Sequence, residues 1–469
     1  MDEYTRGRLA GQVREVRRHR ERLLDDRDLC LTRLLPQKDV QAALERHQVR
    51  YRERLYTPLL TIWTFLYQVL ASDQSCRAAV ARLLAFLSVN GQGSASAKTD
   101  PYCKARQRLP ETLVADLARH TGMELDRQVP PTGLLGGRSI RIADGTTVSM
   151  PDTPANQKAY PQQPGQKQGL GFPILRLVGL ISLSCGAVLD VAMAPYRGKL
   201  TGETTLLRQL LDHLHRGEIL LGDAIFANYW TIALVLERGV DLLTRWDGKR
   251  RMDFRQGRRL GRYDHLVPWH KPIRPSWMSK TLYRSLPQTL RVREVQVPVT
   301  VKGFRCRRLR LVTTLLDPQL YPQQELAAAF RCRWQAELDL RSIKQGMQMD
   351  VLRCKSPAMV RKEIWMHLLA YNLIRKIMAQ AASTAGVCPR DISFTGAMQT
   401  LMAFAVAGWS CLRRRNSLYA AVLKAVAVHR VNDRPDRVEP RAVKRRPKKL
   451  IYLNEPRAVA RARLLKGAA

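Results

Sequence analysis

The chain has 469 residues, of which 45% are hydrophobic and 25% charged, and Lys and Arg number 79 against 40 Asp and Glu. The composition is typical of globular proteins, the length predicts two to four domains, and the net charge of +39 favours a polyanionic partner such as a phosphate backbone. No membrane anchor, lipidation signal, secretory signal or CxxC pair is found, which argues against a membrane protein, a disulfide framework and a zinc site.

Residues 1–128 are predicted to be a helical, basic region for DNA binding and dimerisation. Its expected parts are an arginine-rich start, an apolar stretch, two further helices and a Gly/Ser/Ala linker: residues 14–22, 55–71, 77–87, 102–110 and 91–98. The helix that begins at Tyr102 carries Lys104, Arg106 and Arg108. Basic helices are often only solvated faces, but the charge of the whole chain favours contact with DNA.

From about Arg138 the pattern changes to alternating strands and helices. Strands are expected at residues 139–148, 174–184, 188–194, 218–222 and 240–245, and helices at 203–214 and 229–238. Three strands, a helix, a strand, a helix and a strand is the order of a ribonuclease-H-like sheet. We therefore predict an α/β protein with a ribonuclease-H-like mixed sheet, in a catalytic domain made of residues 138–246 and 319–384.

The strand and helix order is interrupted at residues 247–318. Arg, Pro and alternating strand patterns there predict a β-rich subdomain inserted before the last catalytic helix. Residues 385–469 are predicted to form a helical C-terminal region that ends in a basic tail, including Lys444-Arg-Arg-Pro-Lys-Lys449.

Two aspartates follow apolar strand patterns, in Ser-Ile-Arg-Ile-Ala-Asp144 and Ile-Leu-Leu-Gly-Asp223. An aspartate in such a place is more often a turn or helix-cap residue. However, cutting a phosphodiester without a covalent intermediate calls for two divalent ions about 3.5–4 Å apart, held by acidic residues from separate elements. Asp144 and Asp223 are therefore candidate metal ligands.

Glu337 lies in a helical pattern that carries the sharper signal. At about 100° per residue, Arg333, Glu337 and Lys344 fall at roughly 300°, 340° and 320° from Phe330. One narrow, mostly charged stripe therefore replaces the apolar stripe expected of a core-facing helix. A surface ion-pair ladder explains the same pattern, because Arg333 and Glu337 are four residues apart.

The spacing F-x2-R-x3-E-x6-K resembles the Y-x2-R-x3-E-x6-K signature of one large family of bacterial insertion-sequence transposases, family four. Other stretches resemble the same family: Asp144-Gly-Thr-Thr-Val-Ser-Met-Pro-Asp152, Gly198-Lys199 with Gly202-Glu203, Leu221-Gly-Asp223-Ala, and Glu439-Pro-Arg-Ala-Val-Lys-Arg-Arg-Pro. The resemblance covers about residues 102–446, and its motifs are specific in combination. It implies a DDE transposase with a ribonuclease-H-like fold, which cleaves the ends of an insertion sequence and transfers the strands.

By this resemblance, Asp144, Asp223 and Glu337 are the catalytic residues and hold two Mg²⁺ or Mn²⁺ ions. The residues expected to contact DNA are Phe330, Arg333, Arg341, Lys344, Lys104, Arg106 and Arg108. Phe330 stands where the family has Tyr, so a hydroxyl that would contact a phosphate is missing and weaker end binding is expected. The expected partners are double-stranded terminal inverted repeats and target DNA, bound by a homodimer in a synaptic complex. The expected location is the cytoplasm, at the bacterial nucleoid, with no membrane partner.

Two other functions stay open: a ribonuclease-H-like nuclease without strand transfer, and a catalytically inactive DNA-binding protein. An RNA-binding protein fits the charge but not the acidic triad, and no RRM-like motif is found. Four further acids are expected to be turn, cap or surface residues: Asp152, Asp190, Asp212 and Asp339. Three tryptophans of the central region are expected to pack rather than to stack on a base: Trp246, Trp269 and Trp277.

Overall fold

A computed structural model of the chain describes residues 33–52, 54–89, 95–131, 133–299, 307–407, 415–431 and 453–466. The predicted arginine-rich start and the basic tail around Lys444 lie outside these residues. The chain divides into two compact units, each of which is described by itself. Unit 1 comprises residues 1–130, 185–189 and 341–431, and unit 2 comprises residues 131–184, 190–340 and 432–469.

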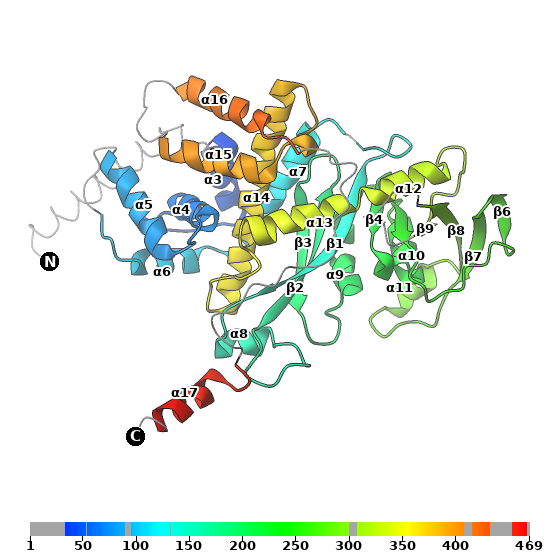
Figure 1. The fold of residues 1–469 in the computed structure, drawn as a ribbon, viewed down its shortest axis with the longest axis horizontal. Helices are drawn as coiled ribbons and strands as arrows, with labels where there is room; N and C mark the ends of the chain where they lie inside the picture. The colour runs from blue at the N-terminus through cyan, green and yellow to red at the C-terminus, as the bar shows by residue number, and fades with distance from the viewer. Residues whose placement is uncertain are drawn as a thin grey trace, which may run out of the picture. The chain divides into compact units, whose positions relative to one another are not determined.

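Unit 1 is helical. Its helices are α3 (Gln37–Arg46), α4 (Pro58–Leu70), α5 (Cys76–Val89), α6 (Asp100–Arg108), α7 (Glu111–Gln128), α14 (Pro357–Ala385), α15 (Phe394–Ala407) and α16 (Arg415–Val428). The longest helix, α14, is buried along most of its length and packs against α4, α7, α15 and α16 (Figure 1). A central apolar helix surrounded by shorter helices therefore forms the core of this unit.

Local sequence sets the ends of these helices. The side chain of Thr57 accepts a hydrogen bond from the Leu60 N–H, and Pro58 follows as the first helical residue, so α4 begins there. The apolar stretch 55–71, expected to be a buried element, is largely this helix. At the end of α14, Gly386 takes a φ of 65°, which a residue without Cβ adopts readily. Within the described part of the chain, no helix has both the length and the hydropathy needed to cross a membrane.

Within the described residues, unit 2 is built on a nine-stranded sheet. Its strands are β1 (Ile140–Ser149), β2 (Ile174–Ser182), β3 (Val188–Pro195), β4 (Ile219–Gly222), β5 (Asp241–Arg245), β6 (Arg258–Gly261), β7 (Asp264–His270), β8 (Thr289–Pro298) and β9 (Arg308–Thr313). They are ordered β3-β2-β1-β4-β5-β9-β8-β7-β6, with β1 antiparallel to β2 and parallel to β4, and β4 parallel to β5. The first five strands have the ribonuclease-H-like arrangement, so the predicted fold class is confirmed.

Helices connect and flank these strands (Figure 1). They are α8 (Pro154–Ala159), α9 (Glu203–Leu210), α10 (Tyr229–Glu237), α11 (Lys280–Ser285), α12 (Gln323–Arg331) and α13 (Trp334–Arg341). A further helix, α17 (Arg457–Lys466), lies near the C-terminal end of the chain and does not flank the sheet (Figure 1). The predicted strands match the observed ones to within two residues at each end. The helix expected at 203–214 is shorter, because the last residues form a separate 3-10 turn at Leu211–His213.

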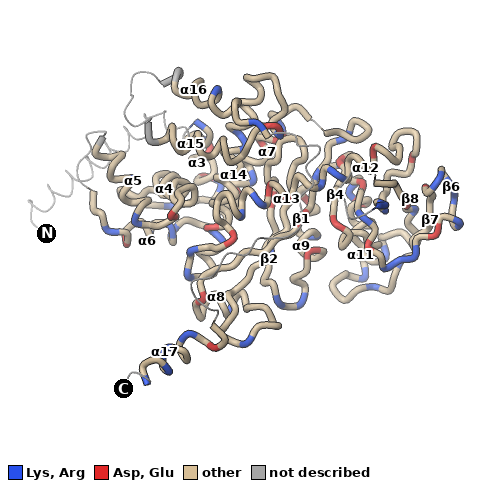
Figure 2. The backbone as a smooth tube through the Cα atoms, in the orientation of Figure 1, with Lys and Arg blue, Asp and Glu red and all other residues tan. Residues whose placement is uncertain are grey.

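The β-rich segment between β5 and α12 continues the sheet. β9 returns to pair antiparallel with β5 through Leu243 and Thr313, and β8, β7 and β6 follow outward. This pairing satisfies the outer N–H and C=O groups that β5 would otherwise leave unpaired. The segment thus extends the mixed sheet on the side of β5. Figure 2 shows that Lys and Arg are spread along both units.

Candidate active site

Asp144 and Asp223 occupy equivalent positions on two neighbouring strands. Ile142 of β1 pairs with Leu221 of β4 in parallel register, and each aspartate lies two residues further along. Asp223 directly follows β4 but keeps an extended backbone, with φ −74° and ψ 169°. Residues two apart on a strand point to the same face, and adjacent strands are about 4.8 Å apart. The register therefore directs both carboxylates to one side of the sheet, where β4 ends.

The sequence of β1 sets the environment of Asp144. Its residues are buried as far as Ala143, and Asp144 is the first with partial access to solvent. Its carboxylate accepts a hydrogen bond from the Gly145 N–H at 3.0 Å. Burial is the main cause that raises the pKa of Asp144 to about 6; the Arg333 charge and the Gly145 hydrogen bond oppose this rise, while Glu337 and Asp223 add to it.

Glu337 lies in the first turn of α13 and is joined to Asp144 through Arg333. Arg333 places Nη2 at 2.7 Å from Glu337 Oε1 and Nη1 at 3.6 Å from Asp144 Oδ2. The carboxylates of Asp144 and Glu337 thus face one guanidinium. Together with the electrostatic effect of Asp223 on Asp144, this brings the three predicted acids into one cluster of unit 2.

The donor set fits a hard divalent cation. Three carboxylates supply only oxygen ligands, and they outnumber the single arginine that contacts two of them. Among the described residues, no group of three His, Cys, Asp or Glu side chains has the spacing of a finished metal site. The guanidinium of Arg333 lies against two of the three acids.

The prediction that Phe330, Arg333, Glu337 and Lys344 share one stripe of a continuous helix is wrong. α12 ends at Arg331, α13 begins at Trp334, and residues 342–346 form a π-helical turn, so the rotation per residue is not constant. The expected ion pair of Arg333 and Glu337 is present, because it spans only one turn. Phe330 ends up buried near the end of α12, where its ring packs.

Two of the other predicted DNA contacts, Arg341 and Lys344, belong to a different unit from the three acids. Arg341 is exposed and Lys344 is half-buried, and both belong to unit 1, whereas Glu337 belongs to unit 2. The structure therefore does not gather these two residues with the three acids in one compact unit.

On α6, Lys104 and Arg108 are exposed, and Lys104 pairs with Asp100 at 2.8 Å. Arg106 is buried instead: it donates hydrogen bonds to Gln68 Oε1 and Cys76 Sγ, each at 3.1 Å. Burial counts against the predicted DNA contact by Arg106.

Two of the four alternative acids are not surface residues. Asp190 is buried in β3, where His213 Nε2 lies 2.7 Å from its carboxylate, and Asp339 is buried on α13. Sequence reasoning assigned both to turns, caps or the surface from residue type alone. For Asp190, the flanking apolar residues of Val188-Leu-Asp-Val-Ala were the signal of burial. Asp152 and Asp212 are exposed, as expected.

The three tryptophans of the central region make packing contacts. Trp269 is buried with Arg250 over its ring, Arg208 lies 3.8 Å from the ring centroid of Trp277, and Arg310 lies 5.0 Å from that of Trp246. The expectation of packing roles agrees with these contacts.

Glu203 is a further acid beside this site that sequence reasoning quoted only as part of a familiar stretch. A Cβ built on Gly145 would lie 2.6 Å from the Glu203 carboxyl carbon. Glu203, in the first turn of α9, therefore packs directly on the residue that follows Asp144. The glycine after Asp144 was the available signal, because it indicates close approach by another group.

Comparison with known proteins identifies relatives along most of the chain. Residues 135–373 match the family model described as "Transposase DDE domain". The chain is 26% identical over 422 residues to the transposase InsG for insertion sequence element IS4 of Escherichia coli strain K12, covering 86% of this chain and 88% of that protein. A shorter match, 35% identical over 68 residues, joins it to the transposase for insertion sequence element IS421 of Escherichia coli, over 14% of this chain and 18% of that protein.

A solved structure with a similar outline is the piggyBac transposase synaptic complex with hairpin DNA. It is 10% identical with a TM-score of 0.43, covering 87% of this chain and 86% of that chain.

Proposed function

Because this chain belongs to the family of DDE transposases, metal-dependent enzymes that cleave DNA and transfer its strands, we propose that Asp144, Asp223 and Glu337 form its catalytic centre. All three lie within the residues that match the family model. The observation that carries the proposal is their clustering: the register of β1 and β4 directs Asp144 and Asp223 to one side of the sheet, and Arg333 contacts both Asp144 and Glu337. Acids placed only for stability would be expected to pair off with separate cations.

The three carboxylates would hold two divalent ions, Mg²⁺ or Mn²⁺. Such ions, when bound, stabilise the attacking and leaving oxygens of an in-line displacement. The chain's own contribution is position: β1 and β4 hold two ligands at a distance set by strand pairing, and the first turn of α13 supplies the third. The half-buried surroundings of Asp144 keep bulk water away and strengthen its attraction for cations.

Arg333 would serve two states of the enzyme. Before DNA and metal are bound, its guanidinium neutralises part of the charge of Asp144 and Glu337. In the complex, the same side chain would turn to a DNA phosphate beside the cut, with Lys344 and Arg341 as further phosphate contacts. Phe330 would support this region by packing, since its ring is buried.

The substrate ends would be the terminal inverted repeats of an insertion sequence, and the joining partner a target DNA. We propose a homodimer that pairs two ends in a synaptic complex and works in the cytoplasm, at the bacterial nucleoid. Residues 1–128 would bind DNA and dimerise, residues 138–246 and 319–384 would catalyse, residues 247–318 would be the inserted subdomain, and the basic tail within 385–469 would add phosphate contacts.

The test is Mg²⁺-dependent cleavage of a plasmid that carries the ends of the native element, comparing wild type with Glu337→Gln. The variant is expected to bind the ends but to cleave at least about a thousandfold more slowly, because a metal ligand is lost. Glu325→Gln is the matched control, since Glu325 is an exposed glutamate in the first turn of the preceding helix. Equal cleavage by wild type and Glu337→Gln would assign Glu337 to an ion pair only.

Strand transfer is measured separately, on ends that are already cut. Family membership predicts joining of such ends to target DNA by the wild type. A chain that cleaves but never joins would instead be a nuclease of the same fold, and one that binds without cleaving would be an inactive DNA-binding protein.

A further inference from the structure

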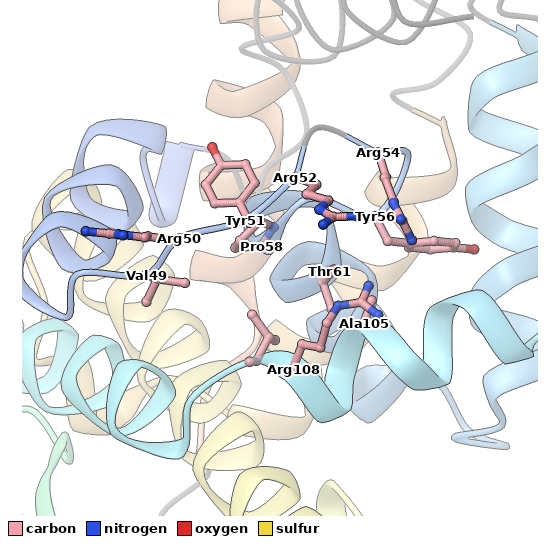
Figure 3. Close-up of a pocket in the computed structure, with 11 residues that line it drawn as sticks. Val49, Arg50, Tyr51, Arg52, Arg54, Tyr56, Pro58, Thr61, Ala105 and Arg108 are labelled. Carbon is pink, nitrogen blue, oxygen red and sulfur yellow. The ribbon is translucent and has the colours of Figure 1, made fainter. Parts of the chain in front are cut away.

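A basic pocket lies in unit 1, and none of the residues proposed for catalysis lines it. It is formed by the segment that joins α3 to α4, the start of α4 and the end of α6 (Figure 3). Its volume is about 500 Å³, within the range of about 300–1,000 Å³ that small-ligand sites occupy. The lining residues are Val49, Arg50, Tyr51, Arg52, Arg54, Tyr56, Pro58, Thr61, Ala105, Arg108 and Leu109.

Among the described residues, no acid neutralises the arginines of this pocket. Figure 3 shows the guanidinium groups of Arg52, Arg54 and Arg108 gathered on one side, whereas Arg50 points away from them. None of the described lining residues is acidic, and within the described chain these four arginines form no ion pair. Cations gathered without a counter-charge repel one another, and an anion among them would remove this cost.

A half-buried aromatic ring lies beside these arginines. Tyr56 packs on Tyr102 with ring centroids 5.6 Å apart, so its ring is held from behind. Burial raises the pKa of Tyr56 to about 12, and its hydroxyl therefore stays neutral at physiological pH. The nearby lining atoms of Thr61, Ala105 and Leu109 come from buried residues. The pocket thus combines an anion site with a rigid, largely apolar surface for a flat group.

We propose that this pocket binds one unpaired nucleotide of a DNA single strand, its phosphate between Arg52, Arg54 and Arg108 and its base against Tyr56. A phosphodiester and a flat base are the two parts that this combination of guanidinium groups and a tyrosine ring recognises. Paired bases are stacked inside the duplex and cannot enter a pocket of this size, so a duplex would touch only its rim. The choice of DNA rests on the proposed function, but the pocket contains none of the three acids.

The experiment measures binding of the full-length protein to a short oligothymidylate and to a duplex of equal length, in EDTA, as a function of salt. Arg52→Gln, Arg54→Gln and Arg108→Gln are each expected to weaken oligothymidylate binding about tenfold. Each should also reduce the slope of log affinity against log salt by about 0.7, the value for one phosphate contact of a single strand. Arg50→Gln is the matched control, because Arg50 lines the same pocket but points away, and it should change neither quantity.

The aromatic part is tested with Tyr56→Leu and Tyr56→Phe. Loss of the ring should weaken binding about fivefold or more, while Phe should bind like the wild type. Because Tyr56 packs on Tyr102, thermal unfolding checks that Tyr56→Leu is folded; if it is not, the arginine variants alone decide.

Three results would overturn the proposal: unchanged binding by the three arginine variants, an equal loss with Arg50→Gln, or an equal loss for the duplex. The last would indicate ordinary contact with a duplex backbone. Failure of the catalytic proposal is distinguishable, because Glu337→Gln should bind the oligothymidylate like the wild type whether or not the triad is correctly assigned.

Discussion

Two of the arginines in unit 2 that contact carboxylates, Arg293 and Arg333, differ in how completely their hydrogen-bond donors are satisfied. Arg293 of β8 is fully buried, as is Asp264 of β7 at 2% exposure, and the two are joined by hydrogen bonds of 2.8 and 2.6 Å. Nη1 of Arg293 also donates to the carbonyl oxygens of Leu315, Asp317 and Tyr321. Arg333 is 18% exposed and has one close contact, at 2.7 Å, and one longer contact, at 3.6 Å.

Arg293 and Asp264 form an ion pair that stabilises the fold, whereas the acids near Arg333 carry more negative charge than this one arginine neutralises. Both carboxylate oxygens of Asp264 accept hydrogen bonds from Arg293, and Nη1 of Arg293 donates to carbonyl oxygens. Around Arg333, the carboxylates of Asp144 and Glu337 share a single guanidinium, and the pKa of Asp144 is raised. Stored repulsion of this kind is relieved by a cation, which is why such clusters occur at sites that bind metals or react.

The largest effect on stability is expected at the satisfied pair. Arg293→Met leaves Asp264 buried without its partner and should lower the free energy of unfolding by about 3–5 kcal/mol. Chemical denaturation measures it, with Arg291→Met as control, because Arg291 is exposed on the same strand. A loss as small as that of the control would show that the pair contributes little.

At Asp144, removal of the charged group is expected to raise the free energy of unfolding instead of lowering it. In the metal-free protein its pKa rises on folding from 3.8 to about 6, so folding is penalised as pH rises through this window and carries the full penalty above it. Asp144→Asn should therefore stabilise the metal-free protein by roughly 3 kcal/mol at neutral pH, and by almost nothing below pH 4. Thermal unfolding in EDTA at several pH values measures this; a gain that is independent of pH would have another cause.

A smaller effect, on the affinity for a divalent cation, is expected at Arg333. Removing its charge in Arg333→Gln should tighten Mn²⁺ binding in the absence of DNA about tenfold, because a competing cation leaves Asp144 and Glu337. Calorimetric titration measures the affinity, and Arg331→Gln, an exposed neighbour, serves as control. Weaker Mn²⁺ binding would mean that Arg333 positions the carboxylates instead of competing for them. End binding by Arg333→Gln should fall.

The smallest effect is expected at Phe330. Phe330→Tyr adds a hydroxyl to a buried ring and should cost less than about 1 kcal/mol if the oxygen reaches solvent or a partner. End binding measured by gel shift should tighten a few-fold. A much larger loss of stability would show that the hydroxyl is trapped in the core.

Much of unit 2 was determined by local sequence. The strands from β1 to β5 were predicted to within two residues, because alternating or continuous apolar runs bounded by turn residues are local signals. The same patterns predicted that Asp144 and Asp223 follow apolar strand runs; Asp223 directly follows β4, whereas β1 continues to Ser149, so Asp144 lies within its strand. The pair of Arg333 and Glu337 followed from their spacing alone.

Only the tertiary structure decided which charges are buried and which acids meet. Asp190, Asp339 and Arg106 are polar by type, yet packing against distant segments buries them. The break between α12 and α13 separates Phe330 from the stripe that a continuous helix would have formed. The meeting of Glu337 with Asp144 joins residues almost two hundred positions apart, and no local pattern encodes which partner a folded chain brings to a side chain.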